Sequence, residues 1–264
     1  MKKQEKHPPP FNLQDAITMS FPRLGLIAPL FAATTATTAQ AHHVWLEQDA
    51  NGATLYFGEF GQNLRETSPG YLDKFIAPVA QRIGVAAAQP LTLSKTPRGF
   101  VLSGSAAKGE SLVAEDAHYP VSERKDGDKL VRSLYVPAAR LVNTFDKQAP
   151  HLTLDLVPTG NNGPDGVEVQ VFYKGQPLPK AKVEVATPSG WGKALRGDDQ
   201  GRLKLSLPWK GSYVLEVKHA DTSAGERGTD KYDRASYVTS LTITQPEGLA
   251  ALPASPAATP NKMN

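Results

Sequence analysis

The stretch Val44-Trp-Leu-Glu-Gln-Asp-Ala-Asn-Gly-Ala-Thr-Leu-Tyr-Phe57 contains two runs of apolar, aromatic and β-branched residues. The dipeptide Asn51-Gly52 separates them, and Asn-Gly between two such runs is the strongest short signal for a β-hairpin. The sequence therefore predicts that the chain after residue 41 begins with two antiparallel strands, 44–47 and 53–57.

Further runs with strand character follow this hairpin. The run Val167-Glu-Val-Gln-Val-Phe172 alternates apolar and polar residues, which is the pattern of a strand with one buried face. Turn signals separate the runs at the spacing of about eight to twelve residues that is typical of β-sandwiches. The other expected strands cover 99–102, 111–114, 129–136, 181–186, 202–207, 212–218 and 236–243.

One stretch has helical periodicity instead. Its apolar residues recur at positions 72, 75, 76 and 79, and Pro69 suits the first turn of a helix. We therefore expect one short helix within residues 69–82, which Pro78 would end or bend early.

The composition changes around Pro158–Gly166, which consists of turn-forming residues. We place a domain junction there, between a mainly β domain at 42–158 and an Ig-like β-sandwich at 159–245. Residues 246–264 are Ala, Pro and small polar residues with almost no core formers, so we expect a disordered tail. The predicted fold class is all-β, with two β-sandwich (Ig-like) domains and one short helix in the first.

The segment before residue 42 has the parts of a secretory signal peptide. Arg23 provides a positive flank, residues 24–33 form a short apolar core, and Ala39-Gln-Ala41 is a small-x-small cleavage site. This core is too short for a bilayer, which needs roughly 20 apolar residues. We expect residues 1–41 to be removed after Ala41, from a start at Met1 or Met19, which leaves a periplasmic protein without a membrane span.

Composition and missing motifs exclude several classes of function. The chain has 29 Lys and Arg against 26 Asp and Glu, without a basic run, which argues against nucleic acid as a partner. It has no cysteine, so thiol catalysis and thiolate metal sites are excluded. The motifs of zincin proteases, serine hydrolases, P-loop proteins and dinucleotide-binding proteins do not occur.

Histidine offers the most specific chemistry in this sequence. His42 and His43 become the first two residues of the cleaved protein. A free α-amino group and the imidazole of the same histidine can bind one metal ion together. An imidazole from elsewhere then completes a three-nitrogen set that suits Cu(II), and imidazole also suits Ni, Zn and Fe.

Two further histidines are candidate ligands. His219 ends the expected strand 212–218 and precedes a polar loop, and loops of this kind often carry binding sites. His118 follows Glu115 and Asp116, which groups carboxylate and imidazole donors. The predicted metal ligands are His42, His43, His118 and His219, each with an ordinary surface residue as the alternative, whereas we expect His151 to be structural.

The same residues resemble a known family. The start Ala41-His-His-Val-Trp-Leu-Glu47 and the segments 171–183, 199–205 and 211–219 are similar to periplasmic components of nickel or cobalt uptake systems. The resemblance covers nearly all of residues 42–245. It implies an Ig-like second domain, a role with a divalent transition metal ion in the periplasm, and ligands at His42 and His219.

The leading hypothesis is a periplasmic binding protein, not an enzyme. It would capture a divalent ion (Ni or Co, with Cu or Fe as further options) and deliver it to an inner-membrane metal transporter. Two alternatives remain. An amino-terminal histidine on a β-sandwich also resembles copper-dependent oxidative enzymes that act on polysaccharides. An Ig-like module that binds a protein or sugar without metal would not depend on the amino terminus.

Overall fold

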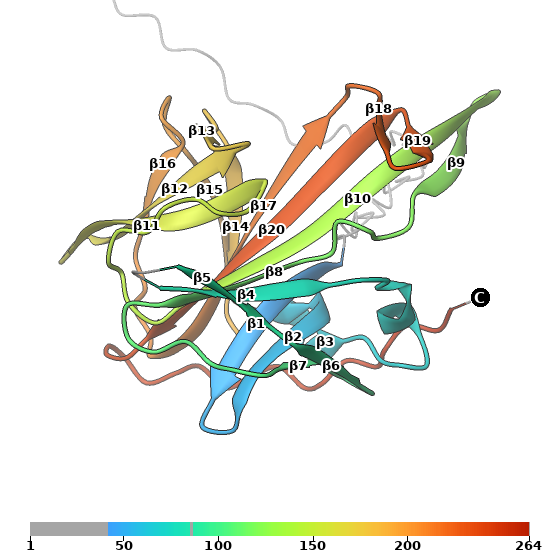
Figure 1. The fold of residues 1–264 in the computed structure, drawn as a ribbon. Coiled ribbons are helices and arrows are strands. Elements are labelled where there is room, and N and C mark those ends of the chain that lie inside the picture. Colours follow the sequence, from blue (N-terminus) through green and yellow to red (C-terminus); the bar gives the residue numbers. More distant parts are fainter. Residues whose placement is uncertain (1–41, 85–86, 264) are drawn as a thin grey trace, which may run out of the picture. The chain divides into compact units, whose positions relative to one another are not determined.

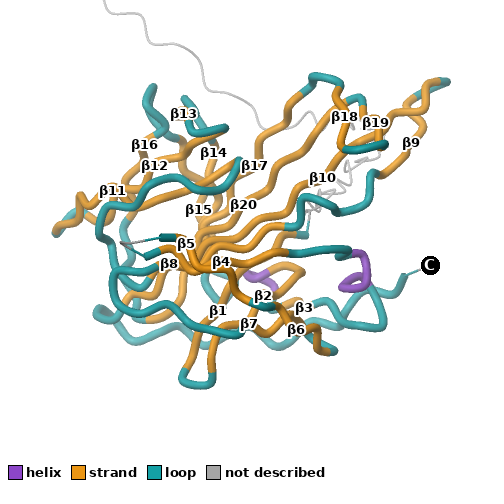
Figure 2. The backbone as a smooth tube through the Cα atoms, in the orientation of Figure 1, coloured by secondary structure: helices purple, strands orange, loops and turns teal. Residues whose placement is uncertain are grey.

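The computed structural model describes residues 42–84 and 87–263, and strands dominate their regular structure (Figure 1, Figure 2). The expected hairpin is present. Strands β1 (His43–Asp49) and β2 (Gly52–Glu59) pair antiparallel, with His43 opposite Gly58 and Asp49 opposite Gly52. Gly52 has φ +134°, a backbone conformation that favours glycine. The all-β prediction is confirmed.

The described strands form three larger sheets and one separate hairpin, β18–β19. The N-sheet has the order β1-β2-β7-β6, with β3 beside β2. The long sheet has the order β15-β14-β17-β20-β10-β8-β4-β5, with β9 beside β10. The C-sheet has the order β11-β12-β13, with β16 beside β12. The bounds are β3 Leu64–Arg65, β4 Val79–Ile83, β5 Ala88–Leu91, β6 Leu93–Thr96, β7 Gly99–Leu102, β8 Ser111–Glu115, β9 Ser122–Asp126, β10 Lys129–Val142, β11 Leu154–Gly163, β12 Gly166–Tyr173, β13 Gln176–Pro177, β14 Lys182–Ala186, β15 Gly192–Arg196, β16 Arg202–Leu205, β17 Gly211–Asp221, β18 Gly225–Arg227, β19 Asp230–Tyr232 and β20 Arg234–Gln245.

The long sheet lies between the other two (Figure 1). Side chains alternate between the two faces of a strand. On β17, Tyr213, Leu215 and Val217 join the core that the C-sheet shares, whereas Val214 packs with Trp45 of β1. A further core fills the space between the N-sheet and β4, β8 and β10. Opposite faces of one sheet therefore carry separate cores.

Strands from both expected domains belong to the long sheet. Strand β10, from the first, pairs in parallel with β20, from the second, and β20 pairs antiparallel with β17. Residues 158–166, where we placed the junction, lie in the β11–β12 hairpin, which has a register shift between Pro158 and Asn162. The described residues form one compact unit.

The short helix expected within residues 69–82 is only a 3-10 turn, Tyr71–Lys74, and strand β4 follows it. Pro78 provides no backbone N–H and disfavours helical geometry at the residue before it. Strand β4 instead pairs with β8 and β5. None of the helices in the described part of the chain is long and apolar enough to cross a membrane.

The segment 246–263, which we expected to be disordered, has no strand but is tied to the rest of the protein. Ser255 N donates to Pro188 O at 2.9 Å, and Ala258 N donates to Asn63 O at 3.2 Å. The Asn63 side chain donates to Ser255 O at 2.7 Å. The segment adds no buried core residue, but its backbone groups have partners on the body of the protein.

Candidate metal-binding site around His42

The first strand sends its two histidines in different directions. The His42 ring lies near Phe57, with ring centroids 5.3 Å apart, whereas the His43 ring lies 5.5 Å from Trp45. His43 Nδ1 lies 2.5 Å from Oε2 of Glu216 on β17. This split follows from the alternation of side chains along a strand. The His-His pair therefore occupies two neighbouring environments.

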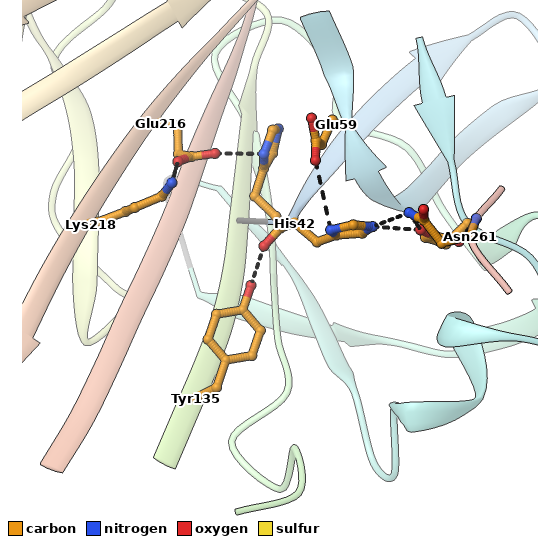
Figure 3. A network of polar contacts seen from close by, with 8 residues as sticks. His42, Glu59, Tyr135, Glu216, Lys218 and Asn261 are labelled. Atoms are coloured by element: carbon orange, nitrogen blue, oxygen red, sulfur yellow. Dashed lines mark hydrogen bonds and ion pairs between the residues drawn. The ribbon is translucent and has the colours of Figure 1, made fainter. Parts of the chain in front are cut away.

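Two carboxylates flank the His42 ring (Figure 3). His42 Nε2 lies 2.5 Å from Oε1 of Glu66, and Nδ1 lies 3.8 Å from Oε1 of Glu59. Both glutamates are buried, and neither has a Lys or Arg partner within the described residues. Tyr135 donates its hydroxyl to the carbonyl of His42 at 2.8 Å, which anchors the backbone beside the ring.

The contacts of Glu66 determine which nitrogen of His42 is available. Glu66 accepts hydrogen bonds from the backbone N–H of Asn261 (3.1 Å to Oε2) and from its side-chain Nδ2 (2.6 Å to Oε1). An ionised carboxylate only accepts, so His42 Nε2 is a donor to it. In the neutral ring, Nδ1 then carries the lone pair, on the side of Glu59.

Oε2 of Glu59, one of the carboxylates that flank this ring, is buried and has no hydrogen-bond partner in the described part of the chain. The same holds for Nε2 of His43, whose ring points to the other side of the strand. A buried polar atom without a partner costs about 1–3 kcal/mol. Such atoms are uncommon in native proteins, and a water, an ion or a ligand often completes them. A ligand bound at either atom would remove this cost.

Glu216 lies between His43 and Lys218. Burial would raise the pKa of Glu216, but the hydrogen bond and charge of His43 outweigh it, together with Lys218, and hold the pKa below its ordinary value. Lys218 Nζ lies 2.6 Å from Oε1 of Glu216. His43 and Glu216 line a cavity of about 280 Å³.

The other predicted ligands lie elsewhere. His219 lies on the face of the long sheet opposite to Glu216, with its ring 4.2 Å from that of Tyr173. His118 is exposed and lines a separate cleft of about 700 Å³. His151, expected to be structural, places Nε2 2.6 Å from Oε1 of Gln81. The structure thus keeps His42 and His43 adjacent and separates His219 and His118 from them.

No group of three or more His, Cys, Asp or Glu side chains within residues 42–84 and 87–263 is arranged to hold a metal ion by itself. The four predicted ligands are therefore not gathered around one point. A metal site at His42 needs a donor that is not a side chain, and the α-amino group freed by cleavage would be such a donor.

Sequence reasoning missed Glu59, Glu66 and Asn261. The hairpin did contain a signal for Glu59. Its register places His43 opposite Gly58, so His42, one residue earlier, lies beside Glu59, one residue later. Glu66 and Asn261 had no local signal, since Asn261 lies 195 residues from Glu66 in the chain.

Comparison of the chain with protein-family models, curated proteins and solved structures gives no match. The expected signal peptide, residues 1–41, lies outside the described residues and stays a prediction. The nickel or cobalt family also stays a prediction from sequence.

Proposed function

We propose that the cleaved protein captures a divalent transition metal ion at His42 in the periplasm and passes it to an inner-membrane transporter. It acts as a binding protein and not as an enzyme. The observation that carries the proposal is the 3.8 Å separation of His42 Nδ1 and Glu59 Oε1, beside the point where cleavage would free the α-amine.

This separation suits two donors to one ion. It is too long for a hydrogen bond. Bonds of about 2.0–2.2 Å from a metal ion to nitrogen and oxygen place two donors roughly 3.4 Å apart at a tetrahedral angle and roughly 4.1 Å apart on opposite sides. The distance of 3.8 Å lies between these limits. The free α-amine of His42 adds a third donor, because it can chelate the same ion as Nδ1.

The charges support a cation at this position. Two buried carboxylates, Glu59 and Glu66, share a single imidazole. A buried charge without a counter-charge is costly, and a divalent cation would balance both carboxylates. Glu66 would orient the ring from behind, as carboxylates do for metal-binding histidines.

The donor set favours ions that accept nitrogen. An amine, an imidazole and a carboxylate suit Ni(II), Co(II) and Cu(II), and Cu(II) is expected to bind tightest in a direct comparison. The ion carried in the cell depends on which metal is available as well as on affinity.

The test is a calorimetric titration of residues 42–264 with a free His42 amine, using Ni(II), Co(II), Cu(II) and Zn(II) in turn. We expect tight one-to-one binding. Acetylation of the His42 α-amine removes this donor and should weaken binding by more than the roughly 10–100-fold typical of a lost outer-shell partner. His219→Ala serves as the matched control and should bind as the unaltered protein does. Equal affinity with and without the acetyl group would overturn the proposal.

A further inference from the structure

Asn261 is the residue of segment 246–263 that contacts the His42 site. Its backbone and side chain both donate to Glu66, and its Nδ2 lies 3.1 Å from Nε2 of His42 (Figure 3). Glu66 is completely buried, whereas Asn261 is largely exposed. A surface residue from the end of the described chain therefore completes the hydrogen bonds of a buried carboxylate.

The rest of the segment is spaced to bring Asn261 to this place. Leu249 bonds to the backbone near Trp209, and the hydrogen bonds closer to the site come from Ser255, Ala258 and Asn261. Ser255, Ala258 and Asn261 are three positions apart, which is the repeat of an extended polyproline-type chain, where every third residue returns to the same side. The prolines between them favour such a chain. The segment thus contacts the protein at regular points and ends at the His42 site.

We propose that Asn261 is a positioning residue of the His42 site. By holding both oxygens of Glu66, it fixes the carboxylate that accepts from His42 Nε2, and so keeps Nδ1 directed at the metal position. This inference rests on the proposed function. Docking of the segment and metal binding are then coupled, and coupling is reciprocal: metal binding tightens the segment as much as the docked segment tightens metal binding.

The first experiment compares Cu(II) and Ni(II) titrations of residues 42–264 carrying Asn261→Ala with the unaltered protein. Loss of a partner behind a metal-binding histidine typically costs roughly 10–100-fold in affinity, and we expect a loss in this range. Lys262→Ala, the adjacent exposed residue without a contact to the site, is the matched control and should leave affinity unchanged.

A double-mutant cycle separates positioning from a general structural effect. In the Glu66→Gln background, Asn261→Ala should cost little further affinity, because both changes disrupt the same contact. Equal losses in both backgrounds would overturn the positioning role.

Hydrogen exchange supplies the reciprocal test. The amide of Ala258 bonds to Asn63 O, so its exchange should slow when metal is added to the unaltered protein and should not slow in Asn261→Ala. Metal binding that Asn261→Ala leaves unchanged overturns this inference alone. Absence of metal binding by the unaltered protein overturns the proposed function and this inference with it.

Discussion

Two groups of buried charged side chains differ in whether each charge has a counter-charge and a full set of hydrogen bonds. Arg140 donates to both oxygens of Asp155, at 2.9 and 2.6 Å, and to Ser111 Oγ at 2.8 Å. Asp155 also accepts the backbone N–H groups of His151 and Leu152. Both charged side chains are completely buried, with equal and opposite charge.

The cluster at His42 lacks this balance. Two carboxylates share one imidazole, and Oε2 of Glu59 has no donor in the described part of the chain. Charges buried for structure are matched in number and in hydrogen bonds, because an unmatched buried charge is costly. The ion of the proposed function would supply the counter-charge that Glu59 and Glu66 lack. This difference guides the choice of residues to change.

The largest effect is expected from Arg140→Met. It leaves Asp155 charged, buried and without its counter-charge, which typically destabilises a protein by about 3–5 kcal/mol. The free energy of unfolding in urea measures the loss. Arg140→Met combined with Asp155→Leu should regain much of it, because no unpaired charge remains. A single-variant loss below about 1 kcal/mol would contradict the structural role of this pair.

Glu59→Gln is expected to change the free energy of unfolding by less, and in the opposite direction. Without metal, the change removes an unmatched buried charge and should raise the free energy of unfolding by about 1 kcal/mol. In saturating Cu(II) the order should reverse, since the variant loses stabilisation by the bound ion. Glu226→Gln, on the surface, is the control and should change stability by less than about 0.5 kcal/mol in either condition. A destabilised metal-free variant would show that Glu59 is already well matched.

The smallest expected effect is on the pH dependence of stability and comes from His219, whose ring packs within the fold away from the His42 site. Burial lowers its pKa, Asp221 acts in the opposite direction, and Lys174 lowers it further. Its ring lies against Tyr173, and Tyr237 pairs with it on the neighbouring strand. Between the lowered pKa and the unfolded value of about 6.5, the unfolded chain binds the proton more readily, so stability falls as pH falls through this range.

His219→Gln should flatten that part of the stability–pH profile, as measured by urea unfolding at a series of pH values. The effect is modest because the ring is partly exposed. His118→Gln removes an exposed imidazole and controls for a general loss of histidine. An unchanged slope in His219→Gln would show that this ring is not the group that titrates.

Local sequence predicted those parts of the fold whose signals are local. Asn51-Gly52 located the first hairpin, and the alternation at 167–172 located β12. The helical spacing at 72–79 predicted more helix than forms, because only Leu72 lies in the 3-10 turn and Val79 already begins β4, which pairs with β8. Exposed strands such as β9, with only polar and charged residues, have no apolar face and therefore gave no signal.

The candidate site could be predicted only in part for the same reason. His42 was predicted from its position after the cleavage motif, which is a local feature. Its partners Glu66 and Asn261 reach it through tertiary folding, and no local pattern marks either residue. His219 was predicted as a ligand because it ends a strand before a polar loop, but its ring packs on Tyr173, on the face of the long sheet opposite to Glu216.

The connectivity of the long sheet also affects how fast the protein can fold. Ser240 of β20 donates to the carbonyl of Val44 in β1, 196 residues away. The sheet is continuous only when β20, near the end of the described chain, pairs with β10. Closing such long loops lowers the entropy of the chain before the distant contacts form. Proteins dominated by distant pairings therefore fold slowly. A chain that forms its middle layer only after its last strand is available stays unfolded for longer, and an unfolded chain suits the proposed export across a membrane.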